Sequence, residues 1–111
     1  MVKGVYMRKK NILICKAVKY HSLCDEDAFF EWIKKIPSIV RYDGALDELY
    51  LYMKGKNISN RDLRELIALF YRYKVEMSQL QIFMNKRNQK WFHDGKIKGY
   101  WHARVFGKKV K

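Results

Sequence analysis

The sequence predicts an α+β fold in a single domain, and three observations support this prediction. The chain has 111 residues, which is enough for one hydrophobic core and too few for two. Apolar residues recur at helical spacing in some segments and alternate with polar residues in others. The predicted elements follow the order β-α-β-β-α-α-β-β, without an internal repeat. We expect a small antiparallel sheet with three helices, spanning residues 1–111, with frayed basic ends at 1–10 and 108–111.

The first two elements are a strand and a helix. Residues 11–20 are rich in β-branched and apolar side chains without helical spacing, which indicates a strand. Acidic residues 25–27 would place negative charge in the first turn of the following helix, and Pro37 would end it.

Two further strands are predicted around a turn. They cover residues 38–42 and 48–53, and we expect the turn at Asp43-Gly44. In the second strand the apolar side chains alternate with Tyr50 and Tyr52, so both tyrosines should lie on the same face.

A helical pair and a hairpin are predicted for the C-terminal half. Ser59 is a good N-cap for a helix over residues 60–73. A second helix is predicted over residues 78–90, with Ser78 as its cap. Asp94-Gly95 favours a tight turn, so residues 92–106 are predicted to form a β-hairpin.

This helix-turn-helix-like order, followed by a basic hairpin, resembles a winged helix-turn-helix over residues 60–106. Val75, Leu80 and Phe83 have the spacing by which a turn and second helix dock on a first. Two residues depart from the pattern. Lys74 stands where the turn usually has glycine, and Phe70 stands where a small residue is usual. The resemblance implies that the 78–90 helix would read a DNA groove.

Charge gives the strongest functional signal. Lys and Arg number 24 against 11 Asp and Glu, a formal charge of +13. Both ends are basic: residues 1–24 hold six bases and no acid, and residues 77–111 hold nine bases and one acid. A compact chain with this excess repels itself, which favours a polyanionic partner. We therefore expect the two ends to form one basic surface.

The sequence predicts a small non-catalytic protein that binds DNA or RNA, mainly through phosphates. Side-chain amides on the 78–90 helix can pair with adenine edges, and nearby cations can hold phosphates. The candidate nucleic-acid-binding residues are Gln79, Gln81, Asn85, Lys86, Arg87, Lys90, Lys96, Lys98 and Arg104.

Aromatic residues among bases are a second signal. Such residues can stack unpaired bases while cations follow the backbone, although a half-buried sheet also favours tyrosine and tryptophan for packing. Two groups qualify: Tyr50 and Tyr52 near Lys54 and Lys56, and Tyr100, Trp101, His102 and Arg104.

Two alternative functions remain open. A compact aromatic-rich domain also suits an inhibitor, such as a toxin-immunity protein or antitoxin, that blocks one acidic protein. A metal-independent ribonuclease would use His93 and His102 for acid–base chemistry, but the sequence does not show that they converge.

Other classes are not supported by the sequence. The sequence contains no apolar run near the roughly 20 residues of a membrane span, nor a signal-peptide core. Cys15, His21 and Cys24 are possible metal ligands, but a second close pair is missing, so no metal or cofactor is predicted. Two cysteines do not make a disulfide scaffold, which favours reduced thiols and a cytoplasmic location.

Overall fold

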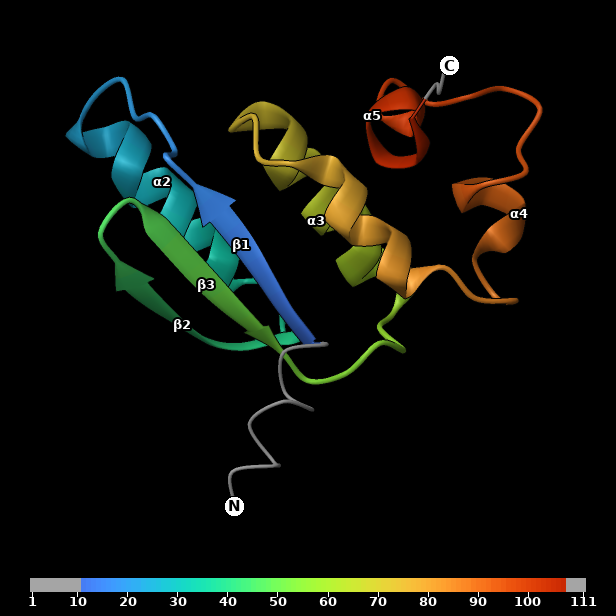
Figure 1. Ribbon diagram of the computed structural model, residues 1–111, viewed down its shortest axis with the longest axis horizontal. Coiled ribbons are helices and arrows are strands. Elements are labelled where there is room, and N and C mark those ends of the chain that lie inside the picture. Colours follow the sequence, from blue (N-terminus) through green and yellow to red (C-terminus); the bar gives the residue numbers. More distant parts are fainter. Residues whose placement is uncertain (1–10, 108–111) are drawn as a thin grey trace.

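A three-stranded antiparallel sheet and a set of helices confirm the α+β class. The structure, a computed structural model, describes residues 11–107; the ends predicted to be frayed lie outside this range. The strands are β1 (Ile12–Lys16), β2 (Ile39–Ala45) and β3 (Glu48–Met53). The sheet order is β1-β3-β2, so the last strand in sequence lies in the centre (Figure 1).

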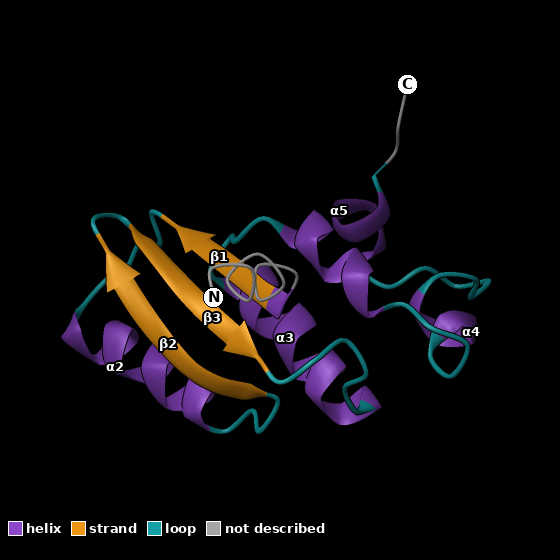
Figure 2. Cartoon of the chain, turned by 60° about the horizontal axis from the view of Figure 1, so that its bottom comes forward, coloured by secondary structure: helices purple, strands orange, loops and turns teal. Residues whose placement is uncertain are grey.

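The helices lie behind the sheet and to one side of it. Helix α2 lies behind the sheet, α3 lies beside it, and the C-terminal elements lie on the far side of α3 (Figures 1 and 2). Their bounds are α2 Leu23–Lys34, α3 Asn60–Arg72, the 3₁₀ helix η2 Met77–Phe83, α4 Gln89–Phe92 and α5 His102–Phe106.

Alternation along the strands assigns the two faces of the sheet. Leu13 pairs with Leu51, and both are buried, whereas Tyr50 and Tyr52 share the opposite, half-buried face as predicted. The turn is not at Asp43-Gly44, which lies within β2, but at Leu46-Asp47. The extended pairing of β2 with β3 moves the turn, and Leu46 takes the positive φ of 57° there.

The two long helices begin at serine caps. Ser22 Oγ accepts a hydrogen bond from the Asp25 backbone N–H, and Ser59 Oγ accepts one from that of Asp62. The buried Asp62 carboxylate in turn accepts hydrogen bonds from the backbone N–H and hydroxyl of Ser38, at 3.0 and 2.5 Å. This joins the start of α3 to the start of β2.

A continuous hydrophobic core connects the sheet to the C-terminal elements. All of its members are less than a tenth exposed, and burial of apolar area on this scale is the main driving force of folding. Large side chains buried almost completely come from α2, the sheet, α3, η2 and α4: Phe29, Ile33, Leu13, Leu51, Leu66, Phe70, Phe83 and Phe92.

Residues 78–90 do not form the single helix predicted. The 3₁₀ helix η2 ends at Phe83, Met84 has extended backbone (φ −66°, ψ 132°), and α4 starts only at Gln89. Hydrogen bonds from two asparagine side chains stabilise the non-helical segment between η2 and α4. Asn85 Oδ1 accepts from the Asn88 N–H at 3.1 Å, and the buried Asn88 amide donates to the Phe83 carbonyl at 2.8 Å.

The predicted C-terminal hairpin is also wrong. Within the described residues, the segment 96–106 contains no strand, and its end forms helix α5. Asp94 does not start a hairpin turn, because its backbone N–H bonds back to the Gln89 carbonyl and ends α4. Buried Val105 anchors α5 on the core. Without a β-hairpin, the resemblance to a winged helix is weak.

In the part of the chain that the structure describes, no helix is long and apolar enough to cross a membrane.

Candidate nucleic-acid interface

The loop after β1 and the end of α3 are held together by one carboxylate. Asp25 Oδ2 accepts from the His21 backbone N–H at 2.8 Å, and Asp25 Oδ1 accepts from the Tyr73 hydroxyl at 2.9 Å. These two hydrogen bonds hold the pKa of Asp25 below its usual value. The carboxylate therefore stays ionised and joins segments 48 positions apart in sequence.

Lys74 follows the C-cap of helix α3 and has a backbone conformation that usually favours glycine. The Val75 N–H donates to the Phe70 carbonyl at 2.9 Å and the Lys74 N–H to the Tyr71 carbonyl at 3.3 Å, a Schellman motif. Lys74 adopts φ 56° to close it. A left-handed conformation costs a non-glycine residue about 1 kcal/mol or more, so lysine is unfavourable at this position of the backbone.

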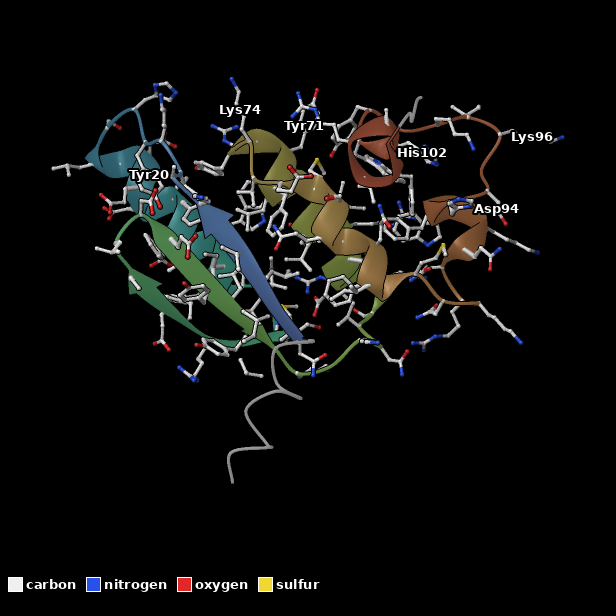
Figure 3. All side chains as sticks on the ribbon, in the orientation of Figure 1. Tyr20, Tyr71, Lys74, Asp94, Lys96 and His102 are labelled. Carbon is white, nitrogen blue, oxygen red and sulfur yellow. The ribbon has the colours of Figure 1, made fainter. Side chains whose placement is uncertain are left out.

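Two adjacent hollows meet at Lys74. The first, about 520 Å³, is lined by residues that include Lys19, His21 and Arg72. The second, about 230 Å³, is lined by Val75, Glu76, Met77 and Arg104 in addition to Lys74. We call the two hollows the cationic furrow and define it by Lys19, Arg72, Lys74 and Arg104. Figure 3 shows Tyr20, Lys74 and Tyr71 along the same edge of the molecule.

The cations of the furrow have no acidic partner among residues 11–107. None of the four forms an ion pair there, and all eleven Asp and Glu residues fall in this range. Two acids, Asp25 and Glu76, also border the furrow; Glu76 accepts a hydrogen bond from the Ser78 hydroxyl at 2.7 Å, and Arg72 helps to lower the pKa of Asp25. The four cations outnumber these two acids, so the furrow has a net positive charge.

The three predicted amides all hydrogen-bond within the chain. Gln79 pairs with both backbone groups of Ile14, at 2.7 and 2.9 Å, and so covers the outer edge of β1. Gln81 donates to the Val105 carbonyl at 2.7 Å, and the Asn85 oxygen accepts from the Arg87 N–H at 2.9 Å. These bonds give each amide a structural role, and sequence alone could not show it.

The predicted cations lie mostly on the C-terminal elements. Lys86 and Arg87 line a shallow hollow with Asn57 and Asn85. Lys90 is exposed on α4, and Lys96 and Lys98 are exposed in the following loop. Among the nine predicted site residues, Arg104 borders the furrow.

The prediction missed Lys19, Arg72 and Lys74 as site residues. The sequence offered one signal for Lys74, which stands where the turn of a helix-turn-helix usually has glycine.

Aromatic side chains adjoin the furrow through Arg104. Its guanidinium carbon lies 4.8 Å from the centre of the Tyr71 ring, within cation–π range. Tyr71 meets Tyr100 edge to face, with ring centres 4.6 Å apart. Tyr50 and Tyr52, the other predicted aromatic pair, are engaged within the chain. The Arg41 guanidinium carbon lies 3.9 Å from the centre of the Tyr52 ring, and the Tyr50 hydroxyl donates to Glu48.

His93 and His102 come together, which the sequence left open. Their ring centres are 6.1 Å apart, and both rings pack against Phe106, at 4.8 and 5.0 Å. His93 Nδ1 lies 2.5 Å from Asp94 Oδ1, and His102 Nε2 donates to the His93 carbonyl at 2.9 Å. Each imidazole therefore uses one ring nitrogen within the chain.

The two cysteines differ in environment. Cys15 is buried, and burial raises the pKa of its thiol to about 12, whereas Cys24 is exposed. Across residues 11–107 no three His, Cys, Asp or Glu side chains are grouped so as to hold a metal ion.

Comparisons of the chain with protein-family models, curated proteins and solved structures gave no match.

Proposed function

We propose that the protein binds a nucleic acid without acting on it chemically, and that the cationic furrow neutralises phosphates. One observation carries the proposal: Lys74 lines two hollows, one of which also has Lys19 from the N-terminal part and the other Arg104 from the C-terminal part. Cations spaced along a furrow can follow a phosphate backbone.

The acid-poor C-terminal region supports the same proposal. Residues 77–107 hold six cations and a single acid, Asp94, and that acid is bound by His93 and Gln89. Groove reading by a continuous 78–90 helix is not part of the proposal, because that segment is broken and its amides are engaged. Phosphate contacts give affinity with little sequence preference.

Titration of labelled single-stranded DNA, RNA and duplex DNA at several salt concentrations tests the proposal. We expect log affinity to fall linearly with log salt, by about 0.7 per phosphate contact on single strands and about 0.9 on duplex DNA. Affinity that does not respond to salt, or no binding near physiological salt, would exclude it. If the protein binds an acidic protein in a salt-dependent way and binds no nucleic acid, the alternative function as a protein inhibitor would be favoured instead.

Charge reversal with a matched control locates the site. The double variant Lys74→Glu with Arg104→Glu should weaken binding at least about tenfold, because charge-assisted contacts contribute roughly 1.5 kcal/mol or more each. The control variant is Lys35→Glu with Lys56→Glu, which changes net charge equally at two exposed lysines that line neither hollow of the furrow. Equal losses in both would show that the furrow has no special role.

The histidine pair favours RNA cleavage as a second candidate function. Imidazoles 6.1 Å apart can act as general base and general acid on one phosphodiester. Incubation with RNA in the presence of a chelator should then give products that His93→Ala or His102→Ala abolishes. Asp27→Ala, which alters an exposed residue that lines neither hollow of the furrow, should leave the products unchanged. Intact RNA with the unmodified protein excludes this candidate.

A further inference from the structure

We infer that Tyr100 and its neighbours form a base-stacking subsite, so that the furrow takes single-stranded rather than duplex nucleic acid. This inference rests on the proposed function and specifies its ligand. It is carried by the exposure of Tyr100, by its contact with Tyr71, on which Arg104 lies, and by the glycine that precedes it.

Tyr100 is exposed although its neighbours pack inward. Its side chain is 60% exposed, whereas Val105 and Phe92 nearby are fully buried. Trp101, the next residue, packs on Phe92 with ring centres 5.6 Å apart. Tyr100 therefore contributes little to the core, and most of the residue is open to solvent.

Gly99 sets this division between outward and inward aromatics. A Cβ at position 99 would lie 2.4 Å from Trp101 Nε1, closer than any side chain can sit. Glycine lets the indole fold back over the backbone and reach Phe92. With Trp101 held inward, the backbone presents Tyr100 on the outside of the loop before the fold binds any ligand.

Tyr71 connects the ring of Tyr100 to Arg104, a cation that would hold a phosphate. Tyr100 contacts Tyr71 edge to face, and Arg104 lies over Tyr71 while bordering the furrow. A strand in the furrow would place a phosphate at Arg104 or Lys74 and could stack an unpaired base on Tyr100. In a duplex the base faces are already stacked, so this contact is specific for single strands.

The tyrosines of the sheet do not offer the same combination. Tyr52 has Arg41 over its ring, and that arginine is itself paired with Asp43. Tyr50 is bonded to Glu48, an anion that would repel a phosphate. The sheet face therefore serves as the comparison surface.

The test separates stacking from phosphate binding by comparing two strands. One is a thymidine strand of roughly 12 nucleotides, within the range of known site sizes; the other is an abasic strand with the same number of phosphates. Tyr100→Ala should weaken binding to the thymidine strand at least about fivefold, the lower end of a single stacking contact. On the abasic strand and on duplex DNA its affinity should match that of the unmodified protein.

Two variants control the interpretation. Tyr100→Phe keeps the ring and should bind the thymidine strand like the unmodified protein. Tyr52→Ala removes a tyrosine from the sheet and should have no effect. A thermal unfolding midpoint for each variant shows whether it is folded. If Tyr100→Ala is not folded, the affinities of the unmodified protein for the thymidine and abasic strands still decide between stacking and phosphate binding alone.

Each outcome decides one of the two proposals. Equal effects of Tyr100→Ala on both strands, or no effect on either, would overturn the stacking subsite while salt-dependent binding keeps the proposed function. Equal affinity of the unmodified protein for the thymidine and abasic strands would overturn it in the same way. Failure to bind any strand would overturn both.

Discussion

Lys74 combines an unfavourable backbone conformation with a position in the proposed binding furrow. Its left-handed backbone is unfavourable for lysine, yet its side chain joins the two hollows of the furrow. Non-glycine residues held in such conformations are concentrated at functional sites. Stability and binding should therefore respond in opposite directions when this residue is changed.

Lys74→Gly is expected to raise the free energy of unfolding by up to about 1 kcal/mol, because glycine adopts positive φ without the steric penalty. Nucleic-acid affinity should fall. Urea unfolding and the strand titration measure the two effects. Leu46→Gly is the matched control, since Leu46 has φ 57° and its side chain is fully exposed. It should gain stability and keep its affinity; a loss of affinity there would show that the change at Lys74 does not act through the furrow.

Asp25 makes stability depend on acid pH. Its folded pKa lies below the ordinary value of 3.8, because His21 and Tyr73 donate to it. Its contribution is therefore complete well above pH 3.8 and is lost as the pH falls through the lowered pKa. Asp25→Asn should be less stable near neutrality and less sensitive to pH below about 4. Chemical unfolding at both pH values checks this, with exposed Asp27→Asn as the control that should follow the unmodified protein.

At the scale of elements, Gln79 acts as a substitute for a neighbouring strand. Its amide makes both backbone hydrogen bonds that a strand would make with Ile14. The outer edge of β1 is thereby closed at one position, which limits pairing with other chains.

Gln79→Ala should destabilise the fold by about 1–2 kcal/mol through the loss of these two bonds. Gln79→Glu keeps the acceptor for the Ile14 N–H but sets a carboxylate oxygen against the Ile14 and Glu76 carbonyls, so it should lose at least as much stability. Hydrogen exchange at the Ile14 amide should be faster in the alanine variant. Reduced nucleic-acid affinity with unchanged stability would instead support the sequence interpretation, in which Gln79 contacts a base.

Sequence signals that lie within one element predicted that element well. They failed where contacts between residues far apart in sequence determine the secondary structure. The Ser59 cap and the apolar stripe predict α3 within a residue or two, because both lie inside the helix itself. Asp94-Gly95 indicated a hairpin, but Val105 and Phe106 find their partners in Phe92 and the core, and α5 forms instead. Asn85 and Asn88 break the 78–90 helix through bonds that no periodicity reveals.

The furrow could not be predicted for the same reason. Lys19 and Lys74 are far apart in sequence, and their segments meet through the Asp25–Tyr73 hydrogen bond and the packing of Tyr73 on Tyr20 and Phe29. Charge counting predicted that bases from the two ends would meet, and this stays a prediction. It could not show that Arg72 and Lys74, at the C-terminal end of α3, line the same hollow as Lys19.

At the scale of the whole molecule, the net charge of +13 should make stability respond to ions. Added salt should raise the thermal unfolding midpoint, because it screens repulsion among the cations. A single-stranded oligonucleotide at about 100 times its Kd should add about 2.7 kcal/mol at the same ionic strength, or several degrees in Tm. Differential scanning fluorimetry measures both; a midpoint that falls with salt would contradict the role given to repulsion.

The strand order determines which strands can pair first as the chain folds. Because β3 lies between β1 and β2 and follows both in sequence, the first strand has no partner until the third is available. The β2–β3 hairpin can close quickly, whereas β1 must wait for a contact that spans some thirty-five residues. During that interval its apolar side chains are an aggregation hazard. Three consecutive basic residues, at positions 8–10, precede β1 in sequence. Charged residues that flank an apolar strand oppose aggregation, because they repel the same segment of another chain.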